Sequence, residues 1–187
     1  MTVKSNILII GSAGRNIGKT EFACKIIKKH STLKKIIGVK IVPVDKNEGN
    51  CHRRIEGCGL CDSLKGDYEI IEETEKNLSK DTSRMLKAGA KKVYLLLVNK
   101  NSLKQGIDAI LKIVPKKSLI VIESNSIRKV LEPGLFIVIK KLMNKSVKQS
   151  CIDVIELADK IIEFNDMNWD FNPDNVIIKN ESWIIKE

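Results

Sequence analysis

The sequence predicts an α/β fold built on a mostly parallel, doubly wound sheet, with a C-terminal β-hairpin. Short apolar runs rich in β-branched residues alternate with longer segments of helical period, which is the pattern of a parallel sheet covered on both faces. A glycine-rich segment, GSAGRNIGKT, separates the first apolar run from the first helical segment. At 187 residues and 43% hydrophobic content, the chain is long enough to bury one substantial core, so one main domain is expected.

Each expected strand is an apolar run bounded by turn residues. The strands are Asn6–Ile10, Ile36–Val42, Val93–Val98, Leu119–Ile122, Leu135–Ile139 and Lys160–Phe164, with Tyr68–Ile71 as an extra edge strand. The expected helices are Lys19–Lys29, Asp81–Ala88, Leu103–Ile113 and Ser150–Ala158, the last with Ile152, Ile155 and Leu157 facing the sheet. In the tail, Val176–Lys179 and Trp183–Lys186 flank turn residues and predict a hairpin, so that residues 166–187 would pack on a domain of residues 1–165.

The segment from Gly11 to Thr20 has the order of strand, glycine-rich loop and helix that phosphate binding requires. Backbone N–H groups in such a loop point at the phosphates, and the positive end of the helix dipole adds to the attraction. Lys19 is expected to contact the β and γ phosphates, and Thr20 to ligate Mg²⁺. Ala13 departs from the GxxxxGK[ST] pattern, so the alternative is a turn that only joins strand to helix. The other expected nucleotide ligands are Gly14, Arg15, Asn16, Ile17, Gly18 and Glu21.

A P-loop enzyme also needs an acidic group at the carboxyl edge of a neighbouring strand, to hold magnesium or to orient water. Glu123 directly follows the apolar run that begins at Leu119 and precedes small polar residues. Asp45 and Asp81 are the other candidates, although Asp81 could equally cap a helix. We therefore expect Lys19, Glu123 and Asp45 to be catalytic, and Thr20, Asp45 and Glu123 to hold Mg²⁺.

Residues 43–67 form a long predicted loop that is rich in glycine, cysteine and charge. Within it, Cys51, His52, Cys58 and Cys61 have the side chains that suit Zn²⁺, Ni²⁺ or an iron–sulfur cluster. The alternatives are reduced surface thiols or a redox dithiol at Cys58 and Cys61.

Composition narrows the class of partner. The formal charge of +10 comes from lysines scattered along the chain, and only 4% of residues are aromatic, so nucleic-acid binding is not favoured. The apolar runs are far shorter than the roughly 20 residues of a membrane-spanning helix, which predicts no membrane association. An N-terminus without a cleavage site predicts a cytoplasmic protein with reduced thiols.

Together these residues resemble the MobB P-loop proteins of molybdopterin-guanine dinucleotide biosynthesis, within the class of dimerising metal- and cofactor-insertion NTPases. The likeness spans about residues 3–165. It rests on the phosphate loop, on Ile37-Gly38-Val39-Lys40, and on Lys80-Asp81-Thr82-Ser83-Arg84 leading to Ala88-Gly89-Ala90. The resemblance implies that Asp81 and Thr82 lie near the nucleotide, that the chain forms a homodimer, and that its client is a metalloenzyme or a cofactor-biosynthesis protein.

The expected fold is therefore of the P-loop NTPase type, and the expected function is that of a slow NTPase adaptor in molybdenum-cofactor or other metallocofactor maturation. The half-motif Asn99-Lys100 lacks the Asp that would specify guanine, so GTP and ATP both remain open. One alternative is a small-molecule kinase or ligase-like transferase on the same fold. Another is a non-catalytic sensor of nucleotide or metal.

Overall fold

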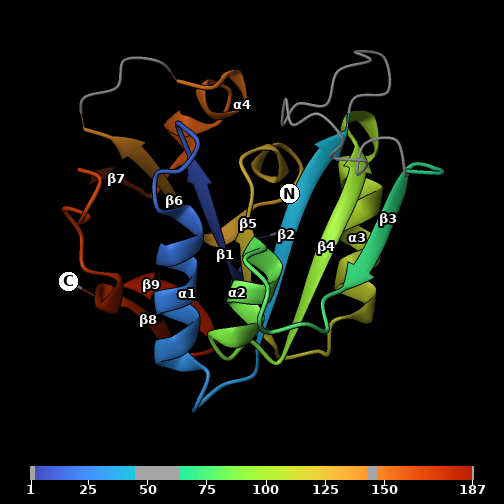
Figure 1. The fold of residues 1–187 in the computed structure, drawn as a ribbon, viewed down its shortest axis with the longest axis horizontal. Helices are drawn as coiled ribbons and strands as arrows, with labels where there is room; N and C mark the ends of the chain where they lie inside the picture. Colours follow the sequence, from blue (N-terminus) through green and yellow to red (C-terminus); the bar gives the residue numbers. More distant parts are fainter. Residues whose placement is uncertain (1–2, 45–63, 143–146, 187) are drawn as a thin grey trace.

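The computed structural model describes residues 3–44, 64–142 and 147–186. They form an α/β fold with a mostly parallel seven-stranded sheet and a separate two-stranded hairpin (Figure 1). No helix in this part of the chain is long and apolar enough to cross a bilayer.

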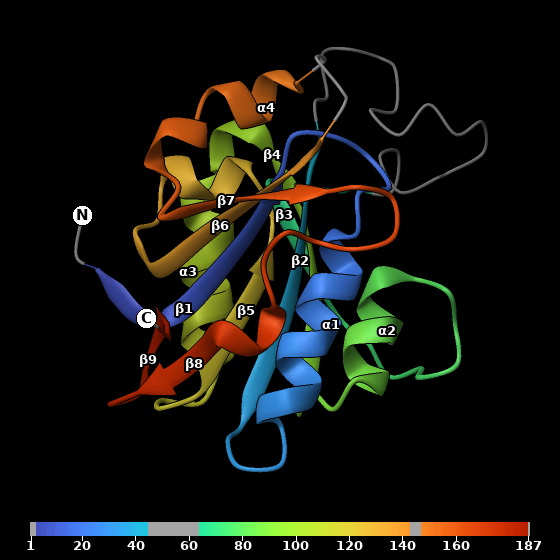
Figure 2. The ribbon, with the colours of Figure 1, turned by 90° about the vertical axis from the view of Figure 1, so that its left-hand side faces the viewer.

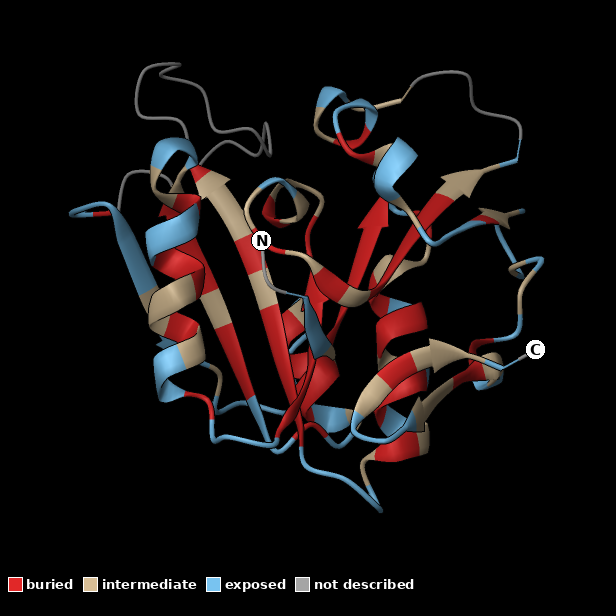
Figure 3. Cartoon of the chain, turned by 180° about the vertical axis from the view of Figure 1, so that it is seen from behind, coloured by how far each residue is buried: buried red, intermediate tan, exposed pale blue. Residues whose placement is uncertain are grey.

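The strand order of the sheet is β3-β4-β2-β5-β1-β6-β7. All neighbouring pairs are parallel except β3 and β4. The central strands are buried on both faces, as is usual for parallel sheets (Figure 3). The strand bounds are β1 (Lys4–Ser12), β2 (Ile36–Val44), β3 (Tyr68–Glu72), β4 (Lys92–Asn99), β5 (Leu119–Glu123), β6 (Pro133–Lys141) and β7 (Lys160–Phe164).

The register of the central strands brings three chain segments to one point at the carboxyl edge. Glu123, the last residue of β5, pairs with Ile10 of β1 on one side. On the other side it pairs with Lys40 of β2. The glycine-rich loop begins directly after β1, so this loop, Glu123 and Lys40 are neighbours because of the strand order.

Helices cover both faces of the sheet and create two hydrophobic clusters. On one face, α1 buries Phe22, Ala23, Ile26 and Ile27, which recur at helical spacing, and α2 lies beside it. On the other face lie α3 and the segment that contains α4. The helix bounds are α1 (Lys19–His30), α2 (Asp81–Lys87), α3 (Leu103–Ile113) and α4 (Gln149–Ile152), with 3₁₀ turns η1 (Lys100–Ser102), η2 (Ser126–Lys129), η3 (Ile155–Leu157) and η4 (Pro173–Asn175).

The predicted continuous helix over residues 150–158 is wrong. The chain leaves α-helical geometry after Ile152 and continues through hydrogen bonds of three-residue spacing into η3. Ile152 is 51% exposed and Leu157 47%, whereas Cys151 and Val154 are buried. Of the predicted apolar stripe, Ile155 packs against the core as expected, but Ile152 and Leu157 do not, because a single helical turn and a 3₁₀ turn present different side chains inward.

The predicted C-terminal hairpin is confirmed and consists of β8 (Val176–Lys179) and β9 (Ser182–Ile185). Its two turn residues, Asn180 and Glu181, both have positive φ, as a tight hairpin turn requires. Trp183 is fully buried and donates from Nε1 to the carbonyl of Asn6 at 3.1 Å. The hairpin lies beside α1 and the start of β1 (Figure 2), so it covers the end of the sheet opposite the glycine-rich loop.

Candidate functional site

The loop between β1 and α1 turns sharply at two residues with left-handed backbone. Asn16 has φ 53° and Gly18, which caps α1, has φ 73°. A Cβ on Gly18 would lie 3.0 Å from the Trp169 ring, so glycine is required there for both backbone and space. The turn leaves the first N–H groups of the 12-residue helix α1 at the carboxyl edge of the sheet, where they can bind an anion.

Asn125, in the turn that follows β5, holds the start of this loop. Its Oδ1 accepts from the Ser12 N–H at 2.7 Å, and its Nδ2 donates to the Ser12 carbonyl at 2.9 Å. A Cβ on Gly11 would lie only 2.7 Å from Asn125 Oδ1, so glycine at position 11 permits this close approach. The loop is thereby attached to the end of β5, where Glu123 lies.

Two carboxylates meet at the hydroxyl of Thr20. Thr20 Oγ1 lies 2.9 Å from Asp81 Oδ1 and 2.8 Å from Glu123 Oε2. The hydroxyl has one proton and can donate to only one of them at a time. Three oxygen-bearing side chains from α1, α2 and β5 therefore converge beside the helix N-terminus, and this all-oxygen set suits Mg²⁺.

Two lysines neutralise this carboxylate pair. Lys40 Nζ lies 2.8 Å from Asp81 Oδ2 and also donates to Glu123 Oε1, which Lys19 Nζ approaches to 3.3 Å. The Glu123 side chain is 1% exposed, so its charge needs these partners. Burial alone would raise the pKa of Asp81, but the adjacent Lys40 ammonium and the Thr20 hydroxyl hold that pKa below its ordinary value.

Other predicted ligands lie away from this cluster. The Ile17 side chain belongs to the core, so only its backbone is available to a ligand. Glu21 accepts from Arg84 Nη2 at 2.6 Å on the surface. Thr82 donates to Glu73 Oε2 at 2.6 Å, and its expected place near the nucleotide stays a prediction.

The remaining predicted ligands divide into two groups. Arg15 and Asn16 are exposed residues of the loop, and Gly14 contributes its carbonyl to bonds with Ser12 and Lys148. Asp45 and the four metal candidates, Cys51, His52, Cys58 and Cys61, lie outside the described residues. Within the part of the chain that the structure describes, no three His, Cys, Asp or Glu side chains gather as a metal site.

Three residues of the site were not predicted as functional from the sequence. Lys40 interrupts the apolar run of β2, and a charge within a buried strand is a signal that could have identified it. Asn125 and Lys148 carried no such signal. In the structure both contact the glycine-rich loop, Asn125 at Ser12 and Lys148 at the carbonyl of Gly14.

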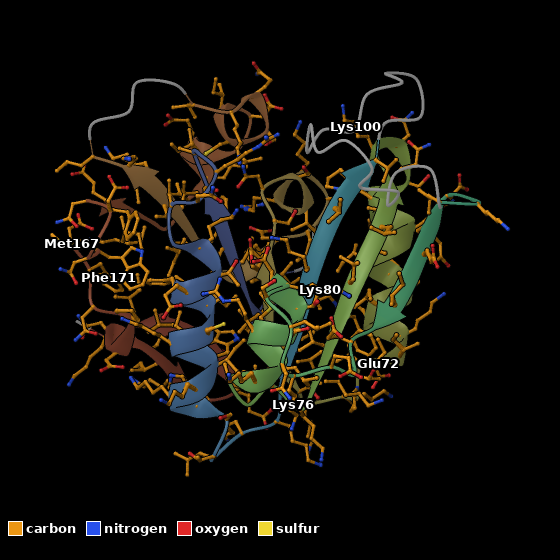
Figure 4. All side chains as sticks on the ribbon, in the orientation of Figure 1. Glu72, Lys76, Lys80, Lys100, Met167 and Phe171 are labelled. Atoms are coloured by element: carbon orange, nitrogen blue, oxygen red, sulfur yellow. The ribbon has the colours of Figure 1, made fainter. Side chains whose placement is uncertain are left out.

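A cavity of about 130 Å³ lies next to Glu123. Its walls come from the ends of β1, β2 and β5, the start of α1, and the segment that leads into α4. Lys100, which follows β4, and Met167 and Phe171, which lie near the hairpin, do not line this cavity (Figure 4).

Comparisons of the chain with protein-family models, with curated proteins and with solved structures found no match. Function is therefore inferred from the geometry of this site.

Proposed function

We propose that this chain is a Mg²⁺-dependent P-loop protein that binds GTP or ATP and hydrolyses it slowly. The observation that carries the proposal is the contact of the Thr20 hydroxyl with Asp81 and Glu123, one residue after Lys19 at the start of α1. A helix N-terminus, a lysine and a hydroxyl between two carboxylates are the groups that a magnesium–triphosphate complex requires.

Each group has a distinct role in this proposal. The backbone N–H groups of residues 14–18 and of the first turn of α1 bind the phosphates, and Lys19 neutralises the terminal ones. Thr20, Asp81 and Glu123 are the residues that would hold a hydrated Mg²⁺ ion. The ion supplies positive charge that stabilises the leaving phosphates. Glu123 additionally orients the attacking water, because it is the carboxylate at the end of the strand next to the loop.

Slow turnover follows from the contacts of Glu123. Its carboxylate is bound by Lys40 and approached by Lys19. Its Oε1 is occupied by the two ammonium groups and its Oε2 by the Thr20 hydroxyl, so neither oxygen is free to accept a hydrogen bond from the attacking water. Hydrolysis then requires Lys19 and Lys40 to leave Glu123 when nucleotide binds.

The biological context that we propose is metallocofactor maturation, which rests on the resemblance to MobB-like proteins. A homodimer, a client metalloenzyme and a transition metal on Cys51, His52, Cys58 and Cys61 are parts of this proposal. The cavity beside Glu123 favours one second candidate, a transferase that moves the terminal phosphoryl group to a small acceptor.

The decisive experiment is nucleotide binding by Lys19→Ala, with Lys28→Ala, an exposed lysine on the same helix, as the matched control. A charged hydrogen bond contributes about 1.5–3 kcal/mol, so Lys19→Ala should weaken triphosphate binding roughly 10- to 150-fold in calorimetry with Mg²⁺. Lys28→Ala should bind like the wild type. Equal affinity of all three proteins would refute the assignment.

Phosphate release then separates the classes. An NTPase releases phosphate without an acceptor, whereas a transferase consumes nucleotide in proportion to the modified acceptor. A sensor consumes almost none.

A further inference from the structure

Residues 13–18 of the glycine-rich loop do not line the cavity beside Glu123. Its walls come from Ser12 and Lys19 at the two ends of that loop, from β2, from Glu123 and the turn after it, and from the segment around α4. At about 130 Å³ it is well above the roughly 10–15 Å³ that one water requires on this measure, so it accommodates several waters or a small ion in their place. Its polar lining includes Lys148 and the hydroxyl groups of Ser124, Ser126 and Ser150.

Lys148 is attached to the glycine-rich loop by both its backbone and its side chain. Its N–H donates to the carbonyl of Ala13 at 2.9 Å, and its Nζ donates to the carbonyl of Gly14 at 2.8 Å. The carbonyl of Lys148 in turn accepts from the N–H of Cys151, which begins the α4 turn. The ammonium is thus placed at the cavity wall by fixed backbone and not by a flexible surface side chain.

The charges around the cavity are unbalanced. Of the charged residues that line it in the described part of the chain, three are lysines, namely Lys19, Lys40 and Lys148, and one is Glu123. Lys40 and Lys19 already contact Glu123. The positive charge of Lys148 is therefore not offset within the lining, and a bound anion would offset it.

Polar groups that can donate to an oxygen surround the same space. The hydroxyl of Ser150 accepts from Asn125 Nδ2 at 3.2 Å, so its own proton can be donated elsewhere. Ser124 and Ser126 add hydroxyl groups from the turn after β5. An ammonium surrounded by hydroxyl donors is the chemistry that binds a carboxylate or a phosphate.

We propose that this cavity is a subsite for a second small oxyanion, a carboxylate or phosphate, which Lys148 and the surrounding hydroxyl groups bind next to the nucleotide. The subsite rests on the proposed function, since a triphosphate on Lys19 defines the first anion. In the transferase candidate this oxyanion would be the acceptor group.

Protonation of Lys148 supports the assignment and supplies a separate readout. Burial first, and then the nearby Lys19, lower the pKa of Lys148 to about 8. The ammonium is charged below that pH in the nucleotide-free chain, and the negative charge of a bound triphosphate raises this pKa. Affinity for the oxyanion should therefore fall as the pH rises above about 8. Burial raises the pKa of the neighbouring Cys151 thiol, so that thiol remains neutral over the same range. The groups that face Lys148 are Arg15 and Lys19 from the loop and α1, Lys40 from β2, Glu123 from β5 and Cys151 from α4.

The test uses the full chain saturated with Mg²⁺ and a non-hydrolysable triphosphate analogue. Calorimetry then measures binding of inorganic phosphate in one arm and of acetate in the other, with chloride as the ionic-strength control. The variants are Lys148→Met and Lys148→Arg. Lys129→Met is the matched control, because it removes an exposed lysine of η2 that pairs with Asp153 outside the cavity.

The wild type and Lys129→Met should bind one of the two probes with equal affinity. Lys148→Met should bind it at least tenfold more weakly, and Lys148→Arg should retain most of the affinity. Because Lys148 Nζ also donates to the Gly14 carbonyl of the loop, the triphosphate affinity of each variant is measured separately, and each probe titration is made at a saturating concentration of the analogue. Thermal unfolding of each variant verifies that it is folded.

Three results would overturn the subsite. The first is that the nucleotide-loaded wild type binds neither probe, and the second is that Lys148→Met binds the probe as well as the wild type does. The third is that Lys148→Met loses tenfold in affinity for the triphosphate but not for the diphosphate, which would make Lys148 a ligand of the terminal phosphate. Failure of the wild type to bind any triphosphate is a different outcome, and it would refute the proposed function itself.

Discussion

The ion pair between Lys40 and Glu123 offers a direct test of the site in the absence of nucleotide. The Glu123 side chain is 1% exposed and that of Lys40 13%, so both charges are largely removed from water. Glu123→Gln keeps the shape but removes the charge, and it replaces one acceptor oxygen with an amide that faces either Lys40 or Thr20. Lys40→Met removes the ammonium and keeps most of the apolar stem.

The magnitude follows from the contacts that remain. A hydrogen bond to a charged group contributes about 1.5–3 kcal/mol, and breaking a buried pair costs about 3–5 kcal/mol. Lys40 keeps Asp81 in Glu123→Gln, and Glu123 keeps Lys19 in Lys40→Met. We therefore expect each single variant to lower the free energy of unfolding by about 2–3 kcal/mol. The double variant should cost about 1–2 kcal/mol less than the sum, because residues in contact are not additive.

The assay is urea unfolding monitored by tryptophan fluorescence, with chelator present and nucleotide absent. The two single variants and the double variant form a double-mutant cycle. The matched control is the same kind of cycle on Lys104 and Asp108, an exposed pair on α3 whose side chains are 60% and 45% accessible. Its coupling should be about 0.3–0.5 kcal/mol. Coupling between positions 40 and 123 no larger than that of the control would refute the buried network and the role of Lys40 in it.

Two further predictions concern other parts of the chain. Burial lowers the pKa of His30, whose Nε2 lies 2.9 Å from the carbonyl of Val176. As the pH falls below about 6.5, the unfolded chain therefore binds a proton at His30 before the folded chain does. The free energy of unfolding should then decrease by at most about 1.4 kcal/mol per pH unit. Urea titrations should show this slope in His52→Gln and not in His30→Gln, and an unchanged slope in the latter would disprove the assignment. Replacing Cys58 and Cys61 with Ser should remove a bound metal and leave nucleotide affinity unchanged, with metal binding weaker at low pH because thiolates must be deprotonated. If anaerobically purified wild type carries no stoichiometric metal and binds added Zn²⁺ no better than the double variant, the redox-dithiol hypothesis is preferred.

Much of the fold could be predicted because buried parallel strands are continuous apolar runs, and the residues after them are polar. The same rule predicted that Glu123 lies at the sheet edge where the glycine-rich loop was expected. In the structure, Glu123 Oε2 lies 2.8 Å from Thr20 Oγ1. Parallel topology alone predicts that strand ends share an edge. The shared edge could therefore be predicted without the strand order, whereas the contact of Glu123 with Thr20 also requires β5 to lie next to β1.

Contacts that depend on strand order could not be predicted in this way. Lys40 meets Glu123 because β2 lies next to β5 in the sheet, and these strands are separated by more than 70 residues. Lys148 belongs to an irregular segment without periodicity, and only its bonds to Ala13 and Gly14 reveal its place. Helical period also failed over residues 150–158, where tertiary packing of Cys151 and Val154 determined which side chains turn inward.

The position of Lys40 leads to one more prediction, about magnesium. In the structure its ammonium lies between Asp81 and Glu123, the carboxylates that we propose to act on the hydrated ion. Two cations cannot both be held closely by the same pair of carboxylates without repulsion, so Lys40 and Mg²⁺ compete for them. Lys40→Met should therefore raise Mg²⁺ affinity in the absence of nucleotide, measured by calorimetry, at least tenfold above that of the wild type. Lys92→Met, which removes an exposed lysine paired with Glu72, should leave it unchanged. If Lys40→Met instead binds Mg²⁺ like the wild type, then Lys40 is not a stand-in for the ion, and Asp81 and Glu123 serve as structural partners of a buried lysine.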